Sequence, residues 1–277
     1  MTINESPYPD SARNQILHGD ATILLPLFRN DSVDLVVSDP PYGTEFQNTE
    51  YDDSQAYVFA HFSVWLAELG RILRDRGHLY LFVPTEHLDR WIAEVRKCFT
   101  YKNTLAFPVY TNNRFNLQNN YGFNGQYVIF AHKGIGRPLN RVNWIPTSEC
   151  WLNDKRNPHP QEYTYCYPNY FGTLIYANVK NNAQRKAKHP NEKNPLLVQR
   201  FIELSSDTGD LIIDPFMGSG TSAIASLKAR RHFIGIEQSD RYWNESKDRI
   251  VLYYQKIDRQ QHHSLDHILD RFIRPLK

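Results

Sequence analysis

Short apolar runs alternate along this chain with longer segments of helical periodicity, and this alternation is the strongest constraint on its fold. Most of the apolar runs lack a clean period of two, as expected of strands that are covered on both faces. Strands that alternate with helices favour an α/β domain with a largely parallel sheet. The expected strands are Asp34–Val37, His78–Val83, Leu105–Tyr110, Tyr127–Ala131, Leu211–Asp214 and Phe233–Glu237. The expected helices are Ala56–Leu73, His87–Phe99, Pro195–Leu204, Ser219–Ala229 and Arg241–Ile257.

The segment at residues 135–188 interrupts this rhythm with five prolines and many asparagines, which indicate loops inserted in the main fold. We therefore divide the chain into residues 1–134, the inserted region 135–188, and residues 189–277. From Lys133 to Arg200 there are eleven Lys and Arg against four Asp and Glu, a local excess of +7, interleaved with tyrosine and tryptophan. This composition suits phosphate neutralisation and base stacking with a nucleic acid. A solvated loop region with a few buried aromatics is the alternative interpretation.

Composition excludes several other classes of protein. The apolar runs are far too short to span a bilayer, and the N-terminal residues lack the basic start and apolar stretch of a signal peptide, so a cytoplasmic protein without membrane contact is expected. Cys98, Cys150 and Cys166 are expected to be reduced thiols. No spaced cluster of metal ligands is seen, and the isolated pair His262–His263 is expected at the surface. The apolar stripe of Leu265–Ile273 predicts a packing helix, with a dimer contact as the alternative.

A glycine-rich turn follows the expected strand Leu211–Asp214 and leads into a helix. Glycines let the backbone turn tightly and approach a ligand, and a helix start offers free N–H groups. About twenty residues further on, Phe233–Glu237 ends in a carboxylate that can accept the ribose hydroxyl protons of an adenosine cofactor. The turn lacks the G-x-G-x-x-G series of a pyrophosphate site, and a purely structural turn is the alternative. Its residues are Asp214, Pro215, Phe216, Met217, Gly218, Ser219, Gly220 and Thr221.

The expected strand Asp34–Val37 leads into the tetrapeptide Asp39-Pro40-Pro41-Tyr42. Proline has no N–H and fixes φ, so the carbonyls of this turn have no local donor. A planar amino group would find acceptors in the Asp39 carboxylate and the Pro40 carbonyl, and a stacking face in the Tyr42 ring. Two acceptors on one amino group raise the electron density at its nitrogen, which direct attack on a sulfonium methyl requires. A turn that merely ends a strand is the alternative.

Three segments, Asp39–Tyr42, Phe216–Gly220 and His189–Pro195, together resemble the motifs of the DNA amino-methyltransferases. Their order resembles the beta class of that family, in which the chain is circularly permuted and the catalytic motif precedes the cofactor loop. The resemblance covers nearly the whole chain. It implies a circularly permuted Rossmann-like methyltransferase fold of about seven mostly parallel strands, one antiparallel, with helices on both faces and the two loops side by side. It also implies S-adenosyl-L-methionine as cofactor, double-stranded DNA as partner, and a target recognition region at residues 135–188.

The resemblance assigns roles to individual residues of this sequence. The expected catalytic residues are Asp39, Pro40, Pro41 and Tyr42, and no metal is expected. The expected cofactor-binding residues are Asp20, Ala21, Asp39, Lys193, Asp214, Phe216, Gly218, Ser219, Gly220, Thr221 and Glu237. Asp20 and Ala21 match residues that hold the cofactor's adenine, and Glu237 matches the ribose ligand. Lys193 matches the lysine near the methionine carboxylate, although Asn194 stands where the family usually has proline.

The expected reaction is methyl transfer to N6 of adenine after the base is flipped out of the duplex. In this family an aspartate at the first motif position favours adenine, whereas a serine favours N4 of cytosine, which is the alternative. Methylation of RNA or of protein glutamine is a weaker alternative, and Asn-Pro-Pro-Tyr would be expected for glutamine. A DNA-binding protein without catalysis should have a damaged glycine turn or acceptor, and both are intact. The sequence leaves open the recognition sequence, a homodimer and a cognate restriction enzyme.

Overall fold

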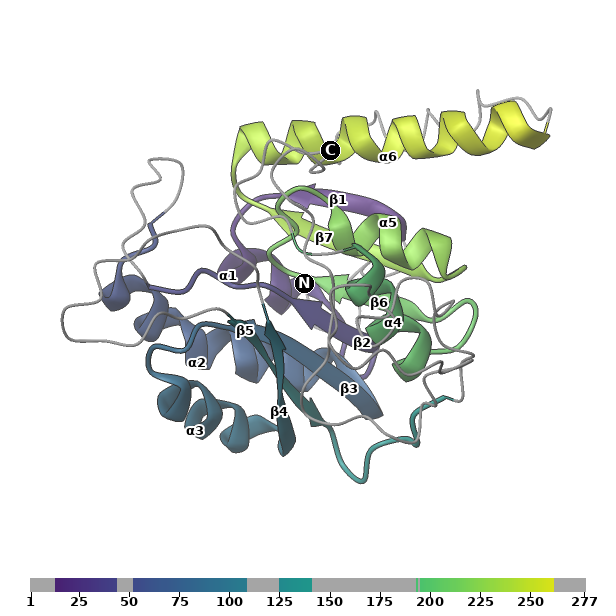
Figure 1. Cartoon of the computed structure of the whole chain (residues 1–277). Helices are drawn as coiled ribbons and strands as arrows, with labels where there is room; N and C mark the ends of the chain where they lie inside the picture. Colours follow the sequence, from purple (N-terminus) through teal and green to yellow (C-terminus); the bar gives the residue numbers. More distant parts are fainter. Residues whose placement is uncertain (1–12, 44–51, 109–124, 141–192, 194, 262–277) are drawn as a thin grey trace, which may run out of the picture.

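In the computed structural model, which describes residues 13–43, 52–108, 125–140, 193 and 195–261, seven strands form one sheet with helices on both faces (Figure 1). The strands are β1 (Gln15–His18), β2 (Val33–Ser38), β3 (Leu73–Val83), β4 (Thr100–Pro108), β5 (Gly125–His132), β6 (Leu211–Asp214) and β7 (His232–Glu237). The helical elements are α1 (Ala21–Leu24), the 3-10 helix η3 (Leu25–Leu27), α2 (Gln55–Ile72), α3 (Leu88–Cys98), α4 (Pro195–Ser205), α5 (Thr221–Lys228) and α6 (Asp240–Gln261).

The strand order across the sheet is β1-β7-β6-β2-β3-β5-β4. Within the described sheet, β5 alone runs antiparallel to its neighbours β3 and β4, and every other pairing is parallel. The expected fold, a mostly parallel sheet of about seven strands with one antiparallel, is therefore confirmed. The expected strands and helices all occur, with boundaries that differ by a few residues.

Three strand segments escaped the sequence analysis, one of them residues 73–77, with which β3 begins. β1 has only four residues and lies at the edge of the sheet against β7, so a single short apolar step is its whole signal. β4 starts at Thr100 rather than Leu105, because a register shift between Tyr101 and Asn103 lets this polar stretch pair with β5. Pairing with a neighbouring strand overrides local propensity here. The expected end of this strand, Tyr110, lies outside the described residues.

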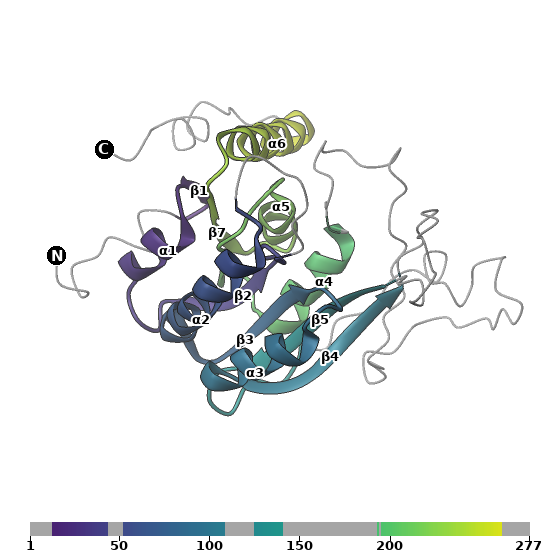
Figure 2. The same cartoon turned by 90° about the vertical axis from the view of Figure 1, so that its left-hand side faces the viewer.

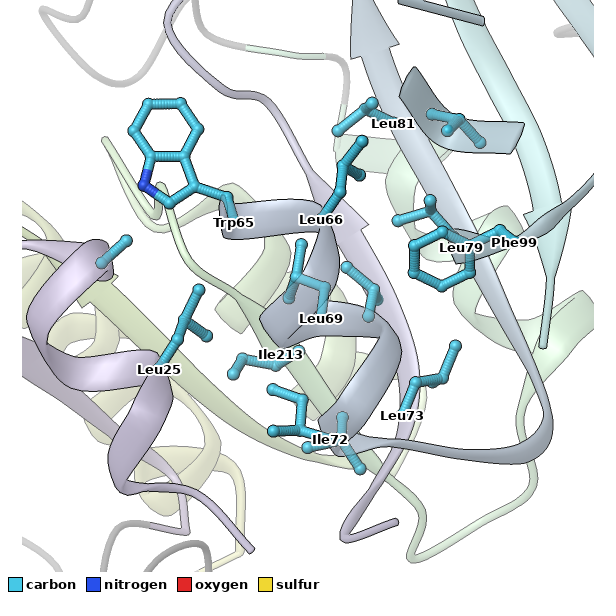
Figure 3. Packing of buried hydrophobic residues seen from close by; sticks show 14 of the residues in the cluster. Leu25, Trp65, Leu66, Leu69, Ile72, Leu73, Leu79, Leu81, Phe99 and Ile213 are labelled. Atoms are coloured by element: carbon cyan, nitrogen blue, oxygen red, sulfur yellow. The ribbon is translucent and has the colours of Figure 1, made fainter. Parts of the chain in front are cut away.

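Helix α2 covers the first face of the sheet and forms the largest part of the core. Its N-terminus is capped by Ser54, whose hydroxyl accepts a hydrogen bond from the Tyr57 amide at 3.2 Å. Figure 3 shows Leu66 and Leu69 of α2 directed towards strand side chains such as Leu79. These leucines are fully buried, and each such burial stabilises the fold by roughly 2 kcal/mol. α2 is thereby held firmly against this face of the sheet.

Helices α4 and α5 cover the second face with the alternate strand residues. Phe201 of α4 stacks on Tyr80 of β3, with ring centroids 4.3 Å apart and planes at 10°. Ala225 of α5 and its C-cap residue Ala229 pack in the same cluster as Leu35 of β2. Helix α6 packs beside α5 and contacts β1 and β7 (Figure 2). The sheet is thus covered on both faces, as the near-continuous apolar strands predict.

A buried polar cluster joins β3 to the end of α4. The His78 ring places Nδ1 2.7 Å from the Ser205 hydroxyl and Nε2 3.0 Å from the Arg137 carbonyl oxygen. The Tyr80 hydroxyl lies 2.8 Å from the same serine oxygen. Burial lowers the pKa of His78 to about 4, because the charged imidazolium would lose its solvation. The histidine is therefore neutral in the folded protein at pH 7.

Several expectations fall on segments beyond this description. Of the inserted region 135–188 only residues 135–140 are described, and Cys150, Cys166, His262–His263 and Leu265–Ile273 lie outside the described residues. Cys98 is a free thiol, as expected. In the described part of the chain, no helix combines the length and the apolarity needed to cross a membrane. The same residues contain no group of three or more His, Cys, Asp or Glu placed to hold a metal ion.

The depressed pKa of His78 predicts an acid-sensitive stability. Between the folded value of about 4 and the ordinary value of 6.5, the unfolded chain binds a proton that the folded protein does not. This histidine should therefore lower the free energy of unfolding by about 3 kcal/mol as pH falls from 6.5 to 4. Chemical denaturation of His78→Asn across this range should show a shallower loss than the wild type. The control Tyr80→Phe, which keeps the titrating ring, should retain the wild-type slope, and equal slopes in all three proteins would contradict the assignment.

Candidate active site

Strands β2 and β6 lie side by side, and the two sequence motifs leave them at the same edge of the sheet (Figure 1). The strands are parallel, with Val36 opposite Ile213, so their carboxyl ends coincide. From β2 the chain continues to β3 on one side, and from β6 it continues to β7 on the other. The strand order therefore reverses between them, which is where open α/β sheets bind ligands. The expectation that the two loops lie side by side is confirmed.

A cavity of about 280 Å³ opens at this point. It is close to the usual size of a small-molecule site. The residues expected from sequence that line it are Asp20, Ala21, Asp39, Pro40, Pro41, Tyr42, Lys193, Asp214, Phe216, Gly218, Ser219, Thr221 and Glu237. Gly220 is the one expected site residue that does not line this cavity. Its φ of +78° caps α5, so α5 begins at Thr221, and a Cβ there would lie 3.1 Å from the Ser246 side chain of α6.

The Asp39 carboxylate is held by two donors in the cavity. Its Oδ1 accepts a hydrogen bond from the Tyr42 hydroxyl, and its Oδ2 lies 2.9 Å from Nζ of Lys193. The Lys193 ammonium is buried, and it also lies 5.3 Å from the ring centres of Tyr42 and Phe82. The lysine was expected near a carboxylate of the cofactor, and in this structure it pairs with the carboxylate of the catalytic motif.

The end of the motif is fixed by a residue that the sequence analysis missed. Gly43 has a φ of +68°, and its amide donates to Oδ1 of the buried Asp53 at 2.8 Å. Asp53 lies just before α2 and lines the cavity. The peptide between Tyr42 and Gly43 is thereby held in place, which orients the aromatic ring of Tyr42. No local pattern distinguishes Asp53 from an ordinary polar residue before a helix.

The glycine loop is fastened to β7 and to α6. The Met217 amide donates to the Ile236 carbonyl oxygen at 2.9 Å, and the Gly218 amide donates to Oε2 of Glu237 at 2.7 Å. Oε1 of Glu237 accepts from the Ser239 amide at 2.8 Å. From α6, Arg249 donates to the carbonyl oxygen of Ser219 at 2.9 Å. The loop is preorganised by contacts from elements that are close to it only in the folded chain.

Asp214, at the end of β6, is a buried carboxyl in the floor of the cavity. It accepts hydrogen bonds from the Phe216 amide at 3.1 Å and from the Ser222 hydroxyl. Burial raises the pKa of Asp214 to about 7, because the carboxylate loses its solvation and lies near Asp39 and Glu237. The Asp214 carboxyl is therefore partly protonated at neutral pH.

The far end of the cavity is aromatic, and two of its residues were not expected from sequence. Asp20 caps α1 through the Thr22 amide at 2.6 Å, and the Tyr57 hydroxyl approaches its second oxygen at 3.4 Å. Trp65 donates to the Thr22 hydroxyl at 2.8 Å, and its ring meets Phe216 edge-on with centroids 4.7 Å apart. Trp65 lies on the buried stripe of α2 and the partly buried Tyr57 packs beside the same core, where an aromatic residue is normally read as core.

The charge of the cavity is unusual for a nucleotide site. Among the described residues that line it there are five carboxyl groups, one lysine and no arginine: Asp20, Asp39, Asp53, Asp214, Glu237 and Lys193. Such a surplus of acidic groups disfavours a pyrophosphate and favours a ligand with positive charge. The turn at residues 214–221 has no G-x-G-x-x-G series for binding a pyrophosphate, which agrees with this charge.

A family model described as DNA methylase, for N6- and N4-methyltransferases, matches residues 33–248. The chain belongs to this family. DNA adenine methyltransferase YhdJ of Escherichia coli is 28% identical over 265 residues, which cover 91% of this chain and 85% of that protein. Type II methyltransferase M2.MboI of Moraxella bovis is 26% identical over 270 residues, which cover 87% of this chain and 88% of that protein. The solved M1.HpyAVI–SAM complex shares the fold with a TM-score of 0.58 and 23% identity over 85% of this chain and 98% of that one.

This DNA methylase takes its methyl group from S-adenosyl-L-methionine, and the chemistry of the cavity fits that molecule. The cofactor carries a sulfonium and an ammonium group, which suit the surplus of carboxyls, and one carboxylate, which suits Lys193. Its adenine ring suits the aromatic end formed by Trp65 and Phe216. Glu237 offers carboxylate oxygens for a ribose.

The raised pKa of Asp214 predicts a stability that falls as pH rises. Between the ordinary value of 3.8 and the folded value of about 7, the folded protein keeps a proton that the unfolded chain has lost. The carboxyl should therefore lower the free energy of unfolding by about 4 kcal/mol across that interval. Urea unfolding of the cofactor-free protein at a series of pH values should show this slope, and Asp214→Asn should remove it. A slope that survives in Asp214→Asn would show that another group titrates.

Proposed function

We propose that this enzyme transfers a methyl group from S-adenosyl-L-methionine to N6 of adenine in double-stranded DNA. The observation that supports this most is the position of Asp39, which borders an acidic cofactor cavity and follows the same sheet edge as the glycine loop. A carboxylate at that point serves both partners of the reaction. It would face the cationic end of a bound methyl donor, and it would accept a hydrogen bond from the amino group that attacks.

The catalytic motif would act as a clamp for the planar amino group. In this proposal the Asp39 carboxylate and the Pro40 carbonyl accept its two N–H bonds, the Tyr42 ring stacks on the base, and Pro41 fixes the turn. Acceptors on both N–H bonds keep electron density on the nitrogen, which is the nucleophile. The bound cofactor supplies an activated methyl on a positively charged sulfur. Pre-alignment of the two groups removes most of the entropic barrier to direct transfer.

The cofactor would be held by residues at both ends of the cavity. Asp20 and Ala21 are proposed to bind its adenine, with Trp65 and Phe216 as apolar walls, and Glu237 is proposed to bind its ribose. The remaining proposed ligands surround the amino-acid end and the glycine loop: Asp39, Lys193, Asp214, Gly218, Ser219, Gly220 and Thr221. Gly220 would act through the loop backbone, because it does not line the cavity.

The target base would have to leave the duplex to reach Asp39. Extrusion of a base costs a few kcal/mol, which a stacking ring such as Tyr42 offsets. We propose that residues 135–188 form the target recognition region, on the basis of their position between the two halves and of their basic and aromatic composition. The segments 1–134 and 189–277 would then be the two halves of one catalytic domain.

Adenine is preferred over cytosine for two reasons. The first motif position is Asp39, and the relative from Escherichia coli is named as an adenine methyltransferase. N4-cytosine methylation remains the second candidate, because the family model spans both activities and the same clamp accepts either amino group. Relatives named as type II methyltransferases favour a restriction partner. A homodimer and a cytoplasmic location complete the proposal.

Replacement of Asp39 separates the clamp from the cofactor site. In Asp39→Ala, methylation of DNA should fall by at least about a hundredfold, because one preorganised acceptor is lost. Binding of S-adenosyl-L-homocysteine by calorimetry should stay within the same order of magnitude, because the other cofactor ligands remain. Mass spectrometry of nucleosides from DNA treated with the wild type should show N6-methyladenine.

The matched control is Asp31→Ala, which removes an acidic residue of a surface ion pair with Lys133 and should leave activity unchanged. Full activity of Asp39→Ala would overturn the clamp. N4-methylcytosine as the product would replace adenine by the second candidate and leave the clamp intact.

A further inference from the structure

Lys193 is the only basic side chain among the described residues that line the cavity, and it forms an ion pair with Asp39 of the catalytic motif. Its Nζ lies 2.9 Å from Oδ2 of Asp39, and the side chain of the lysine is 7% exposed. Oδ1 of the same carboxylate accepts the Tyr42 hydroxyl. Both oxygens of the Asp39 carboxylate, which would accept an amino proton of the target base, thus already have a donor from the protein.

An ammonium group on Asp39 works against the proposed chemistry. It occupies space beside the carboxylate, and its positive charge withdraws the electron density that should be shared with the incoming amino group. The lysine cannot simply swing away, because a buried charge without a partner is strongly unfavourable. Departure of Lys193 therefore needs another anion within reach, and the described cavity wall offers only carboxyls that already have donors, such as Asp214 and Glu237.

A zwitterionic amino acid is the ligand that resolves this conflict. Its carboxylate can take the ammonium of Lys193, while its own ammonium faces the carboxyls of Asp39 and Asp214, which lie close enough to affect each other electrostatically. The exchange keeps every buried charge paired, so no unpaired ion is created at any stage. The methyl donor carries such a group at the end opposite its adenine.

We propose that Lys193 is a positioning residue that occupies Asp39 until the amino-acid end of the cofactor takes over its ammonium, so that cofactor binding prepares the acceptor for the base. This inference rests on the proposed function. The order in which cofactor and base bind then depends on one ion pair. Asp39 accepts the amino group of the base well only after the Lys193 ammonium has moved from Asp39 to the carboxylate of the cofactor. Because linkage is reciprocal, capture of the base should tighten the cofactor in turn.

Two ligands distinguish the exchange of the Lys193 ion pair from an effect of simply filling the cavity. S-adenosyl-L-homocysteine carries the amino-acid end, and 5′-methylthioadenosine lacks it but keeps the nucleoside. Capture of the amino group is measured as the ratio of dissociation constants for two duplexes, one with the target base and one with the same base lacking its amino group. The target is first located by sequencing methylated DNA from cells that express the enzyme.

In the wild type this ratio should be near one without ligand and with 5′-methylthioadenosine. It should rise to about ten- to a hundredfold with S-adenosyl-L-homocysteine, the contribution of a hydrogen bond to a charged acceptor. Lys193→Met should show the raised ratio under all three conditions, because no ammonium group then occupies Oδ2 of Asp39. Lys193→Arg, which keeps the charge, should restore dependence on the amino-acid end. The matched control Lys133→Met removes the lysine of the Asp31 ion pair and should behave as the wild type.

A raised ratio in the ligand-free wild type would overturn the inference, and so would an equal response to the two ligands. Both outcomes are read from the wild type alone, so the test stands even where Lys193→Met does not fold. A loss of affinity in Lys193→Met that is equal for both duplexes, with the ratio still dependent on the ligand, would also overturn it. Failure of the proposed function has a different signature, because the wild type would then leave DNA without a methylated nucleoside.

Discussion

The parallel pairing of β2 with β6 is the constraint on which the rest of this structure depends. These strands lie far apart in the chain, yet Leu35 and Val36 pair with Ile212 and Ile213 at the centre of the sheet. Because the crossovers from the two strands run in opposite directions, they leave a crevice beyond the carboxyl ends of these strands, where the cavity opens. This pairing brings the catalytic motif and the glycine loop together, although they lie far apart in the sequence. Residues of α2 then close the aromatic end of the cavity.

Electrostatics shape the cavity as strongly as its walls do. A set of carboxyls crowded around one lysine is unfavourable in isolation, and the protein manages it with internal donors and with a bound proton. Backbone amides hold Glu237, a serine hydroxyl and an amide hold Asp214, and Lys193 holds Asp39. The carboxyl groups create a negative electrostatic potential in the cavity, which favours the binding of a cation. Burial, followed by the nearby carboxyls of Asp39 and Glu237, explains why the pKa of Asp214 rises to about 7.

Much of the fold was predictable because its signals are local. Buried strands and the two loops can be recognised from a few consecutive residues. The order of the motifs indicates the permuted topology through the resemblance to the beta class. Other features depend on neighbours distant in sequence. β1 is defined by its edge pairing with β7, Trp65 looks like any core residue of an amphipathic helix, and the partner of Lys193 is set by folding. The roles of the site residues stay predictions.

The contact between Arg249 and the glycine loop ties the behaviour of α6 to the cofactor site. The guanidinium reaches the Ser219 carbonyl oxygen from a helix that packs at the margin of the sheet against β1 and β7. A displacement of α6, by a fused domain or by a binding partner, would therefore act through this hydrogen bond on a loop that lines the cavity. The helix thus offers an engineer a way to alter the glycine loop from outside the cavity, without a substitution in the Asp39–Tyr42 segment.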